Sequence, residues 1–178
     1  MIDIQPILRR FQRAQNNARS RGILKTAPLQ IRDNGVKILS MVCHRDIVMY
    51  LVAAKSLYQR LGFGSFIVVD DGSLTADDRQ ILTRHLNPQI IHIDVISTAG
   101  CPKGGTWERL LKILDFTDAS YVIQLDADTL TLGPIEDVRR CVQENVSFTQ
   151  VLSRTLGTPA DPPEVVVRVD ACVVSIVP

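Results

Sequence analysis

Two carboxylates stand one residue apart at the end of an apolar run. The stretch YVIQLDADTLTLG, residues 121–133, is apolar for most of its first five residues and then carries Asp126 and Asp128. Carboxylates at this spacing present several hard oxygen ligands to Mg²⁺ or Mn²⁺, which accept water and substrate phosphates as their remaining ligands. Such a metal offsets the charge that develops on a departing diphosphate. The alternative is a polar strand-to-loop junction with an Asx-type turn, because Asp-x-Asp alone is a weak pattern.

The elements that must position these acids alternate between strands and helices. Short apolar runs predict strands at residues 36–44, 90–96 and 121–126, and a strand that enters a turn at 65–73. Helical spacing predicts helices at 46–62, 75–86, 106–116 and from Gly133-Pro134 to about Asn145. This alternation predicts an α/β domain with a doubly wound, mostly parallel sheet.

Ligands bind to such sheets beyond the carboxyl ends of the strands. Three of the predicted strands end in polar residues at this edge, namely His44-Arg45, Asp70-Asp71 and Asp126-Asp128. The convergence of three polar strand ends is a stronger indication of a binding site than any one of the motifs taken singly.

The two acidic motifs together resemble a known family. FIVVDDGSLT (66–75), followed about fifty residues later by YVIQLDADTLTLG, resembles the nucleotide-sugar glycosyltransferases of the GT-A fold, a Rossmann-like fold with an Asp-x-Asp motif. The resemblance covers roughly residues 36–150. It implies metal-dependent transfer of a sugar from a nucleoside diphosphate sugar to an acceptor that the sequence does not identify.

The resemblance also implies roles for individual residues. Asp70 or Asp71 would contact the base edge and the ribose, Asp126 would contact the ribose or the metal, and Asp128 would bind the metal directly. Further residues would line the nucleotide pocket or direct a cation toward the donor sugar or phosphate: Cys43, His44 and Arg45 for the pocket, and Arg109, with Lys103 as the weaker candidate, for the cation.

Three other functions remain open. A non-catalytic nucleotide-sugar-binding module would need the same residues. Sugar-nucleotidyltransferases share the general fold, but their first strand is normally followed by a glycine-rich loop with Arg and Lys, where this chain has SMVCHRDIVMY. DADTL also fits the opening motif of haloacid-dehalogenase-like phosphatases, but their Lys and second acidic pair lie downstream. Here no Lys follows Lys112, and the second acidic pair lies upstream.

The two ends of the chain differ from the predicted domain. Residues 1–35 are polar and basic, with arginines interleaved with apolar residues at helical spacing, which predicts a basic helical extension that contacts a membrane surface or is simply solvated. Residues 151–178 are rich in Pro and Val, which predicts either a final strand or a truncated acceptor half. Asp170 is the acid of the final run and a candidate substitute base.

Composition excludes some classes of partner. The 178 residues carry 20 basic and 19 acidic side chains, a formal net charge of +1, so the overall charge does not favour a nucleic-acid partner. The four cysteines form no CxxC pair, which predicts reduced thiols. Because the sequence shows no signal peptide or membrane-spanning stretch, we expect a cytoplasmic protein.

Overall fold

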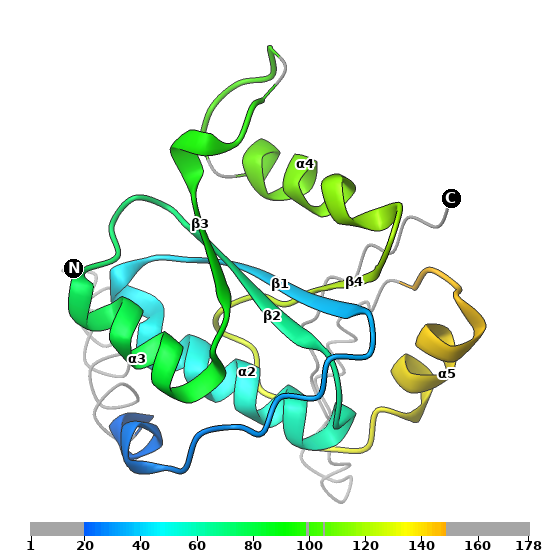
Figure 1. The fold of residues 1–178 in the computed structure, drawn as a ribbon. Coiled ribbons are helices and arrows are strands. Elements are labelled where there is room, and N and C mark those ends of the chain that lie inside the picture. The colour runs from blue at the N-terminus through cyan, green and yellow to red at the C-terminus, as the bar shows by residue number, and fades with distance from the viewer. Residues whose placement is uncertain (1–19, 99, 105, 149–178) are drawn as a thin grey trace, which may run out of the picture.

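The computed structural model describes residues 20–98, 100–104 and 106–148, and these residues form one sheet with helices on both faces (Figure 1). The strands are β1 (Val36–Val42), β2 (Ser65–Asp70), β3 (Gln89–His92) and β4 (Tyr121–Gln124). The α-helices are α2 (Ile47–Leu61), α3 (Ala76–Leu86), α4 (Thr106–Thr117) and α5 (Glu136–Glu144). The 3₁₀ helices are η1 (Arg21–Lys25), η2 (His44–Asp46) and η3 (Ile93–Val95).

All neighbouring strands are parallel, in the order β3-β2-β1-β4. Ile38 of the central strand β1 is in register with Phe66 of β2 and with Ile123 of β4. Parallel strands need long crossover connections, which α2, α3 and α4 supply here. The strand order and the crossovers confirm the predicted doubly wound α/β fold.

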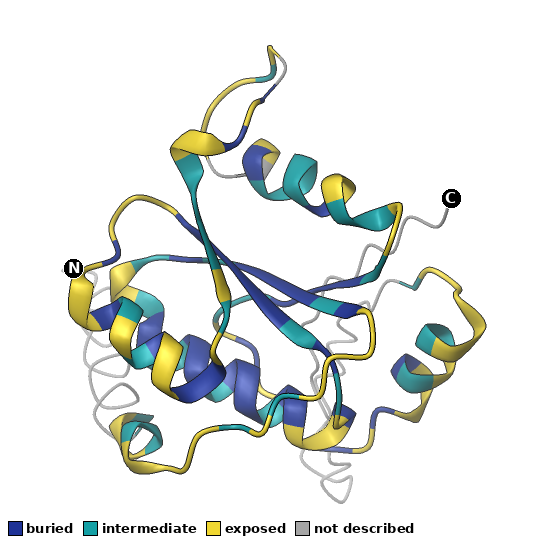
Figure 2. Ribbon diagram, viewed as in Figure 1, coloured by how far each residue is buried: buried dark blue, intermediate teal, exposed yellow. Residues whose placement is uncertain are grey.

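Each face of the sheet has its own cluster of buried side chains. Successive residues of a strand point to opposite faces, so Ile38 packs with side chains of α2, α3 and α5, whereas Leu39 packs with Ile113 of α4. Figure 2 shows the result as buried central strands beneath helices whose outer surfaces are exposed. A sheet covered on both faces explains why both VKILSMV and SFIVVD carry apolar side chains on both faces, with Lys37, Ser40, Ser65 and Asp70 as their polar residues.

The third strand is shorter than predicted. The pattern predicts a strand to residue 96, but β3 ends at His92 and the chain turns into η3. The ring Nδ1 of His92 accepts a hydrogen bond from the N–H of Asp94 at 3.2 Å. Because this side-chain acceptor replaces a partner in the strand ladder, it ends the strand despite the apolar residues that follow.

The described part of the predicted N-terminal extension is held against α2 and α3. Lys55 of α2 is only 4% exposed, and its Nζ donates to the Thr26 hydroxyl and the Ala27 carbonyl, each at 2.7 Å. Its third neighbour is the ring Nδ1 of His85 in α3, at 3.0 Å. An ammonium group can only donate, so Nδ1 must accept and His85 is neutral. Burial, together with the nearby charges of Lys55 and Arg84, lowers the pKa of His85.

This arrangement predicts a loss of stability in mild acid. The pKa of His85 is lower in the folded protein than in the unfolded chain, so the unfolded state takes up the proton first as the pH falls below about 6.5. Stability is complete above that pH and is lost toward the folded pKa, with a slope of at most about 1.4 kcal/mol per pH unit for one proton. Urea unfolding at about pH 7.5 and about pH 5.5 measures the loss.

A matched pair of variants isolates His85 in this measurement. His85→Gln keeps an acceptor for Lys55 and should flatten the pH dependence between these two conditions. His92→Gln changes a histidine that is 40% exposed and should keep the slope of the parent protein. If the parent and His85→Gln lose the same stability in acid, His85 does not carry this effect.

Some predictions concern residues outside the described part. The predicted basic helix up to residue 19, the Pro/Val-rich tail and Asp170 lie outside the described residues.

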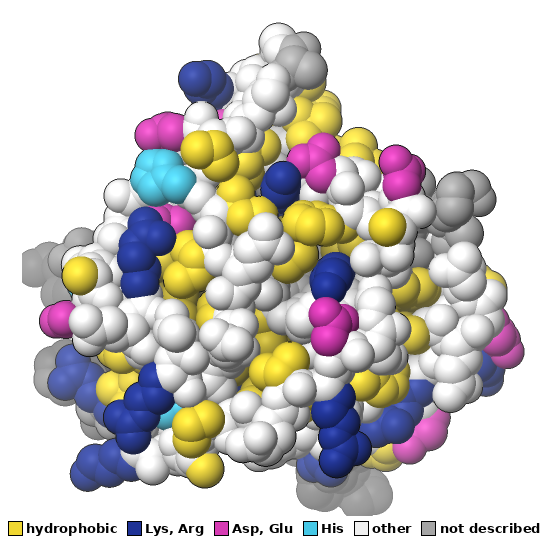
Figure 3. Space-filling view, in the orientation of Figure 1, with side chains coloured by type: hydrophobic (Ala, Val, Ile, Leu, Met, Phe, Trp, Pro, Cys, Tyr) yellow, Lys and Arg dark blue, Asp and Glu magenta, His cyan; other side chains and the backbone are white. Residues whose placement is uncertain are grey.

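Within the described residues, no helix is both long enough and apolar enough to cross a membrane. Cys43, Cys101 and Cys141 are free thiols. On the face seen in Figure 3, charged side chains of both signs are interspersed, with Lys and Arg gathered toward the lower edge.

Candidate functional site

The strand order places a candidate site between the ends of β1 and β4. The chain winds outward from β1 through β2 to β3 and then crosses back to β4, so the winding reverses between β1 and β4. In open α/β sheets the ligand crevice lies outside the carboxyl ends of the strands at this point. The N–H of Leu125 donates to the carbonyl of Leu39 at 2.9 Å, which keeps the exit of β4 beside β1.

The loop after β4 is anchored by buried residues and carries its carboxylates toward solvent. Leu125 and Thr129 are 1% and 2% exposed, and the Thr129 hydroxyl donates to the Asp126 carbonyl at 3.0 Å. The Asp126 side chain accepts from Nη1 of Arg109 in α4, also at 3.0 Å. Asp128 is exposed, and no described side chain forms an ion pair or hydrogen bond with it. The structure therefore brings together Arg109, predicted to act on the donor sugar or phosphate, and Asp126, predicted to contact the ribose or the metal.

The loop after β1 is ordered by its own polar contacts. The thiol of Cys43 donates to Asp46 at 3.0 Å, and burial, followed by the Asp46 carboxylate, raises the pKa of this thiol. Cys43 is therefore protonated at neutral pH and is suited to packing rather than to nucleophilic attack. Arg45 is 82% exposed and lies 3.5 Å from the other oxygen of Asp46, so its guanidinium is accessible to a ligand.

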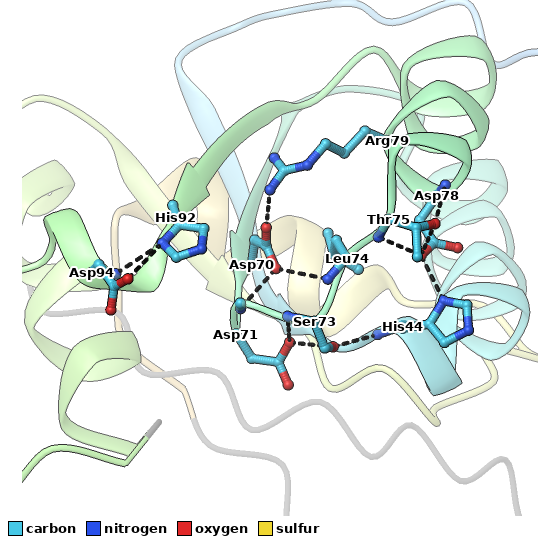
Figure 4. A network of polar contacts seen from close by, with 11 residues as sticks. His44, Asp70, Asp71, Ser73, Leu74, Thr75, Asp78, Arg79, His92 and Asp94 are labelled. Atoms are coloured by element: carbon cyan, nitrogen blue, oxygen red, sulfur yellow. Dashed lines mark hydrogen bonds and ion pairs between the residues drawn. The ribbon is translucent and has the colours of Figure 1, made fainter.

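His44 links this loop to α3. Its ring Nδ1 lies 2.6 Å from Asp78, the residue that forms the capping box of α3 with Thr75 (Figure 4). Burial opposes ionisation of Asp78, but the hydrogen bonds from Thr75 and His44 outweigh it and hold the pKa of Asp78 below its ordinary value. The ring of His44 is still 61% exposed. His44 thus positions the β1 loop and leaves one ring edge at the solvent side.

Asp70, the last residue of β2, is used inside the protein. It is 0% exposed, and its Oδ1 accepts from the N–H groups of Gly72 and Leu74 at 2.8 and 3.2 Å. Its Oδ2 forms an ion pair with Arg79 of α3 (Figure 4). Since both oxygens are occupied and shielded, Asp70 fixes the turn and offers no surface to a ligand.

Asp71 is the exposed member of the pair. Its Oδ1 accepts from the N–H and the hydroxyl of Ser73, at 3.0 and 2.6 Å. The Ser73 hydroxyl oxygen also accepts from the N–H of His44 at 2.8 Å, so one serine joins the exits of β1 and β2. Oδ2 of Asp71 has no hydrogen-bond partner among the described residues and faces solvent.

The remaining histidines are unsuited to a site at β4. His85 is buried against Lys55, and His92 is the last residue of β3, at the edge of the sheet farthest from β4. Among the described residues, no group of three or more His, Cys, Asp or Glu side chains is placed to hold a metal ion. Two carboxylates nevertheless suit Mg²⁺ or Mn²⁺, which are commonly bound by one or two carboxylates together with substrate phosphates. Asp126 and Asp128 fit such a metal and do not form a site made of protein ligands alone.

A surface hollow of about 440 Å³ lies elsewhere. Its lining includes Asn34 before β1, Phe63 before β2, Ser120 before β4 and Gln143 of α5. These residues are at the amino ends of the strands, the opposite edge from Asp126 and Asp128. The hollow is therefore separate from the candidate site.

Several residues that shape the site were not predicted from the sequence. Lys103, which was predicted, is exposed in the loop before α4. The missed residues are Ser73, Asp78, Arg79 and Thr129. Only Asp78 had a visible signal, because Thr-x-x-Asp before a helix indicates a capping box; the others depend on contacts between separate elements.

We compared the chain with family models, curated proteins and solved structures. No family model and no curated protein matches the chain. The solved structures that resemble it include the mannosyltransferase Ktr4p from S. cerevisiae, which is 13% identical with a TM-score of 0.43. The match covers 74% of this chain and 46% of the Ktr4p chain, so this chain spans less than half of that protein's length.

Proposed function

We propose that this chain is the donor-binding domain of a metal-dependent glycosyltransferase, which moves a sugar from a nucleoside diphosphate sugar to an acceptor. The observation that supports this most is the group formed by Arg109, Asp126 and Asp128 at the switch point of the sheet. Two carboxylates suit a divalent metal and a guanidinium suits phosphate oxygens, and the fold binds ligands at this place.

The dimensions of the sheet suit a nucleotide that lies across it. Neighbouring strands are about 4.8 Å apart, so the exits of β4 and β2 are separated by two spacings, or about 10 Å. A nucleotide can then place its diphosphate at Asp128 and its base or ribose at Asp71, with Cys43, His44 and Arg45 between them. Asp71 is the acceptor of the Asp70-Asp71 pair because Asp70 is buried.

In this proposal each residue has a separate task. Asp126 and Asp128 hold Mn²⁺ or Mg²⁺, which when bound offsets the charge that develops on the leaving diphosphate. Arg109 donates to a phosphate oxygen through a charge-assisted hydrogen bond, and Lys103, one loop earlier, adds positive charge. The hydrogen bond from the N–H of His44 to the Ser73 hydroxyl oxygen holds the β1 and β2 exits together.

A second candidate, a donor-binding module without catalysis, is favoured by one observation. At the exit of β4, the acids among the described residues are those assigned to the metal. His44, at the neighbouring β1 exit, is assigned to the nucleotide pocket and bonded to Asp78, and His85 and His92 lie elsewhere. The described residues thus offer no obvious general base for an acceptor hydroxyl. Binding without turnover in a broad acceptor mixture would favour the module, whereas sustained sugar transfer would favour the enzyme.

Calorimetric titration tests the function that both candidates share. The full chain is titrated with UDP, GDP, ADP and CDP, first with Mn²⁺ and then with EDTA. We expect at least one nucleoside diphosphate to bind, and to bind more tightly with Mn²⁺ than with EDTA. If none binds, or if Mn²⁺ makes no difference for any of them, the proposal is wrong.

Replacing Asp71 should weaken nucleotide binding. If the Asp71 carboxylate accepts a hydrogen bond from the base or the ribose, its removal leaves that donor unpaired. At this exposed position the loss of binding free energy should be about 1 kcal/mol, or roughly fivefold in affinity. Asp71→Ala should therefore bind the preferred nucleotide more weakly in the same titration. Asp77→Ala, which removes an exposed acid in the first turn of α3, is the control and should bind as the parent does. Equal affinities for all three proteins would show that the Asp-Asp-Gly turn has only a structural role.

A further inference from the structure

The ion pair between Arg109 and Asp126 is built so that it can open. Arg109 is 30% exposed and Asp126 is 38% exposed, and Nη1 lies 3.0 Å from Oδ1. An ion pair that water can reach contributes little to stability, because both charges are well solvated when they separate. Breaking this pair would not leave a buried charge without a partner. The ion pair between Asp70 and Arg79 is the opposite case, because the Asp70 carboxylate is fully buried and would lose its cation.

The loop that carries Asp126 does not depend on Arg109 for its shape. Its backbone is tied to β1 by the N–H of Leu125, and the buried Thr129 hydroxyl donates to the Asp126 carbonyl. The start of α4 is likewise fixed, because the buried Glu108 accepts from the N–H of Gly104 at 3.0 Å. Arg109 and Asp126 therefore meet from two elements that are each anchored by other contacts.

A divalent metal and Arg109 would compete for the same carboxylate. Two neighbouring carboxylates repel each other, and in the unliganded protein the guanidinium neutralises one of them while Asp128 has no partner among the described residues. A dication that binds Asp126 and Asp128 would displace the guanidinium. The freed guanidinium would still project from α4 beside the metal, with its N–H donors directed at whatever anion the metal holds.

We propose, resting on the proposed function, that Arg109 is an exchange residue: it occupies the place of the metal at Asp126 in the unliganded protein and is transferred to the diphosphate when the metal binds. Arg109 then affects two binding steps in opposite directions. It weakens the binding of the metal alone by competition. It strengthens the binding of the diphosphate to the metal-loaded protein by donating hydrogen bonds.

This opposition provides the test. Binding of Mn²⁺ alone is measured from the electron paramagnetic resonance signal of the free ion, and binding of UDP and GDP at saturating Mn²⁺ is measured by calorimetry. Arg109→Gln should bind Mn²⁺ about two- to fivefold more tightly, as expected for removal of a solvent-accessible ion pair. It should bind the preferred nucleoside diphosphate about tenfold more weakly, as expected for loss of a charge-assisted hydrogen bond.

Two further variants define the outcome. Arg109→Lys keeps the cation and should restore both affinities most of the way to those of the parent. Arg140→Gln removes a guanidinium from another exposed ion pair, that with Asp137 on α5, where Nη2 and Oδ1 are 2.7 Å apart. It should change neither the affinity for Mn²⁺ nor that for the nucleoside diphosphate. If Arg109→Gln shifts both affinities in the same direction, or leaves that for Mn²⁺ unchanged, the exchange does not occur.

The failure of this inference is distinguishable from the failure of the proposed function. If Asp128→Asn binds Mn²⁺ as tightly as the parent, the metal site itself is wrong and the exchange is overturned with it. If the parent binds no Mn²⁺ without nucleotide, the exchange is overturned, whereas the metal site is still tested by the titrations with nucleoside diphosphate. If Asp128→Asn loses Mn²⁺ but Arg109→Gln gains none, the metal site stands and only the exchange is wrong.

Discussion

Replacing Asp128 by asparagine is expected to weaken nucleoside diphosphate binding by at least about tenfold in Mn²⁺ and to change it little in EDTA. Mutating a residue that only hydrogen-bonds to a metal ligand typically weakens metal affinity by about 10- to 100-fold. Loss of a carboxylate that binds the metal directly should have at least that effect. Asparagine keeps the size and one oxygen of the side chain but removes the charge that holds the cation. Calorimetric titration of both proteins under both conditions gives the four affinities.

Asp128→Asn should change the measured affinities without changing the stability of the fold. Asp128 is exposed and has no hydrogen-bond or ion-pair partner among the described residues, so the variant should unfold within about 0.5 kcal/mol of the parent. Asp137→Asn removes the charge of another exposed acid, on α5 and paired with Arg140, and should leave all four affinities unchanged. Equal losses in Mn²⁺ and in EDTA would mean that Asp128 contacts the nucleotide itself or shapes the loop.

Most helices and strands could be predicted because their signals are local. The helix predicted at 46–62 is found at Ile47–Leu61, and Gly62, the predicted stop, has a φ of 83°, which glycine adopts without strain. β1 and β2 are buried on both faces and are therefore mostly apolar rather than alternating. The carboxyl end of β3 was missed because the apolar pattern continues to Ile96, whereas the bond from Asp94 to the His92 ring ends the strand.

The order of the strands could not be predicted from periodicity. Hydrophobic spacing shows that a segment is a strand with one or two buried faces, but it does not show which strand lies beside which. The order β3-β2-β1-β4 places β1 beside β4, although about eighty residues separate them in the sequence. This pairing is what joins the loop of His44 to the loop of Asp126 at one crevice.

The site was predictable as an edge of the sheet but not in its individual contacts. Asp70 and Asp71 were both predicted at that edge, but adjacent residues at a strand end point in different directions. Only the packing of α3 decides that Asp70 turns inward to Arg79 while Asp71 remains exposed. Similarly, nothing in the sequence connects His44 with Asp78, because they meet only when α3 packs beside the β1 exit.

The inward direction of Asp70 leads to the last prediction, which concerns stability. Arg79→Met leaves the Asp70 carboxylate fully buried without its cation. Loss of one partner of a fully buried ion pair costs about 3–5 kcal/mol, and since Arg79 is itself 39% exposed we expect about 2–3 kcal/mol of unfolding free energy to be lost. Asp70→Asn keeps an acceptor for the N–H groups of Gly72 and Leu74 but places an amide donor beside the guanidinium, so it should also destabilise.

In the double variant Asp70→Asn, Arg79→Met, the buried carboxylate of Arg79→Met and the amide–guanidinium contact of Asp70→Asn are both absent. It should therefore lose less unfolding free energy than the sum of the two single variants. Urea unfolding of the four proteins at neutral pH measures this coupling, and Asp71→Asn, which changes the neighbouring exposed acid, should remain within about 0.5 kcal/mol of the parent. Strictly additive losses would show that Asp70 and Arg79 do not act as a pair. A variant of Asp70 that keeps its stability but loses nucleotide affinity would instead mean that this carboxylate reaches the ligand, and the assignment of that role to Asp71 would be wrong.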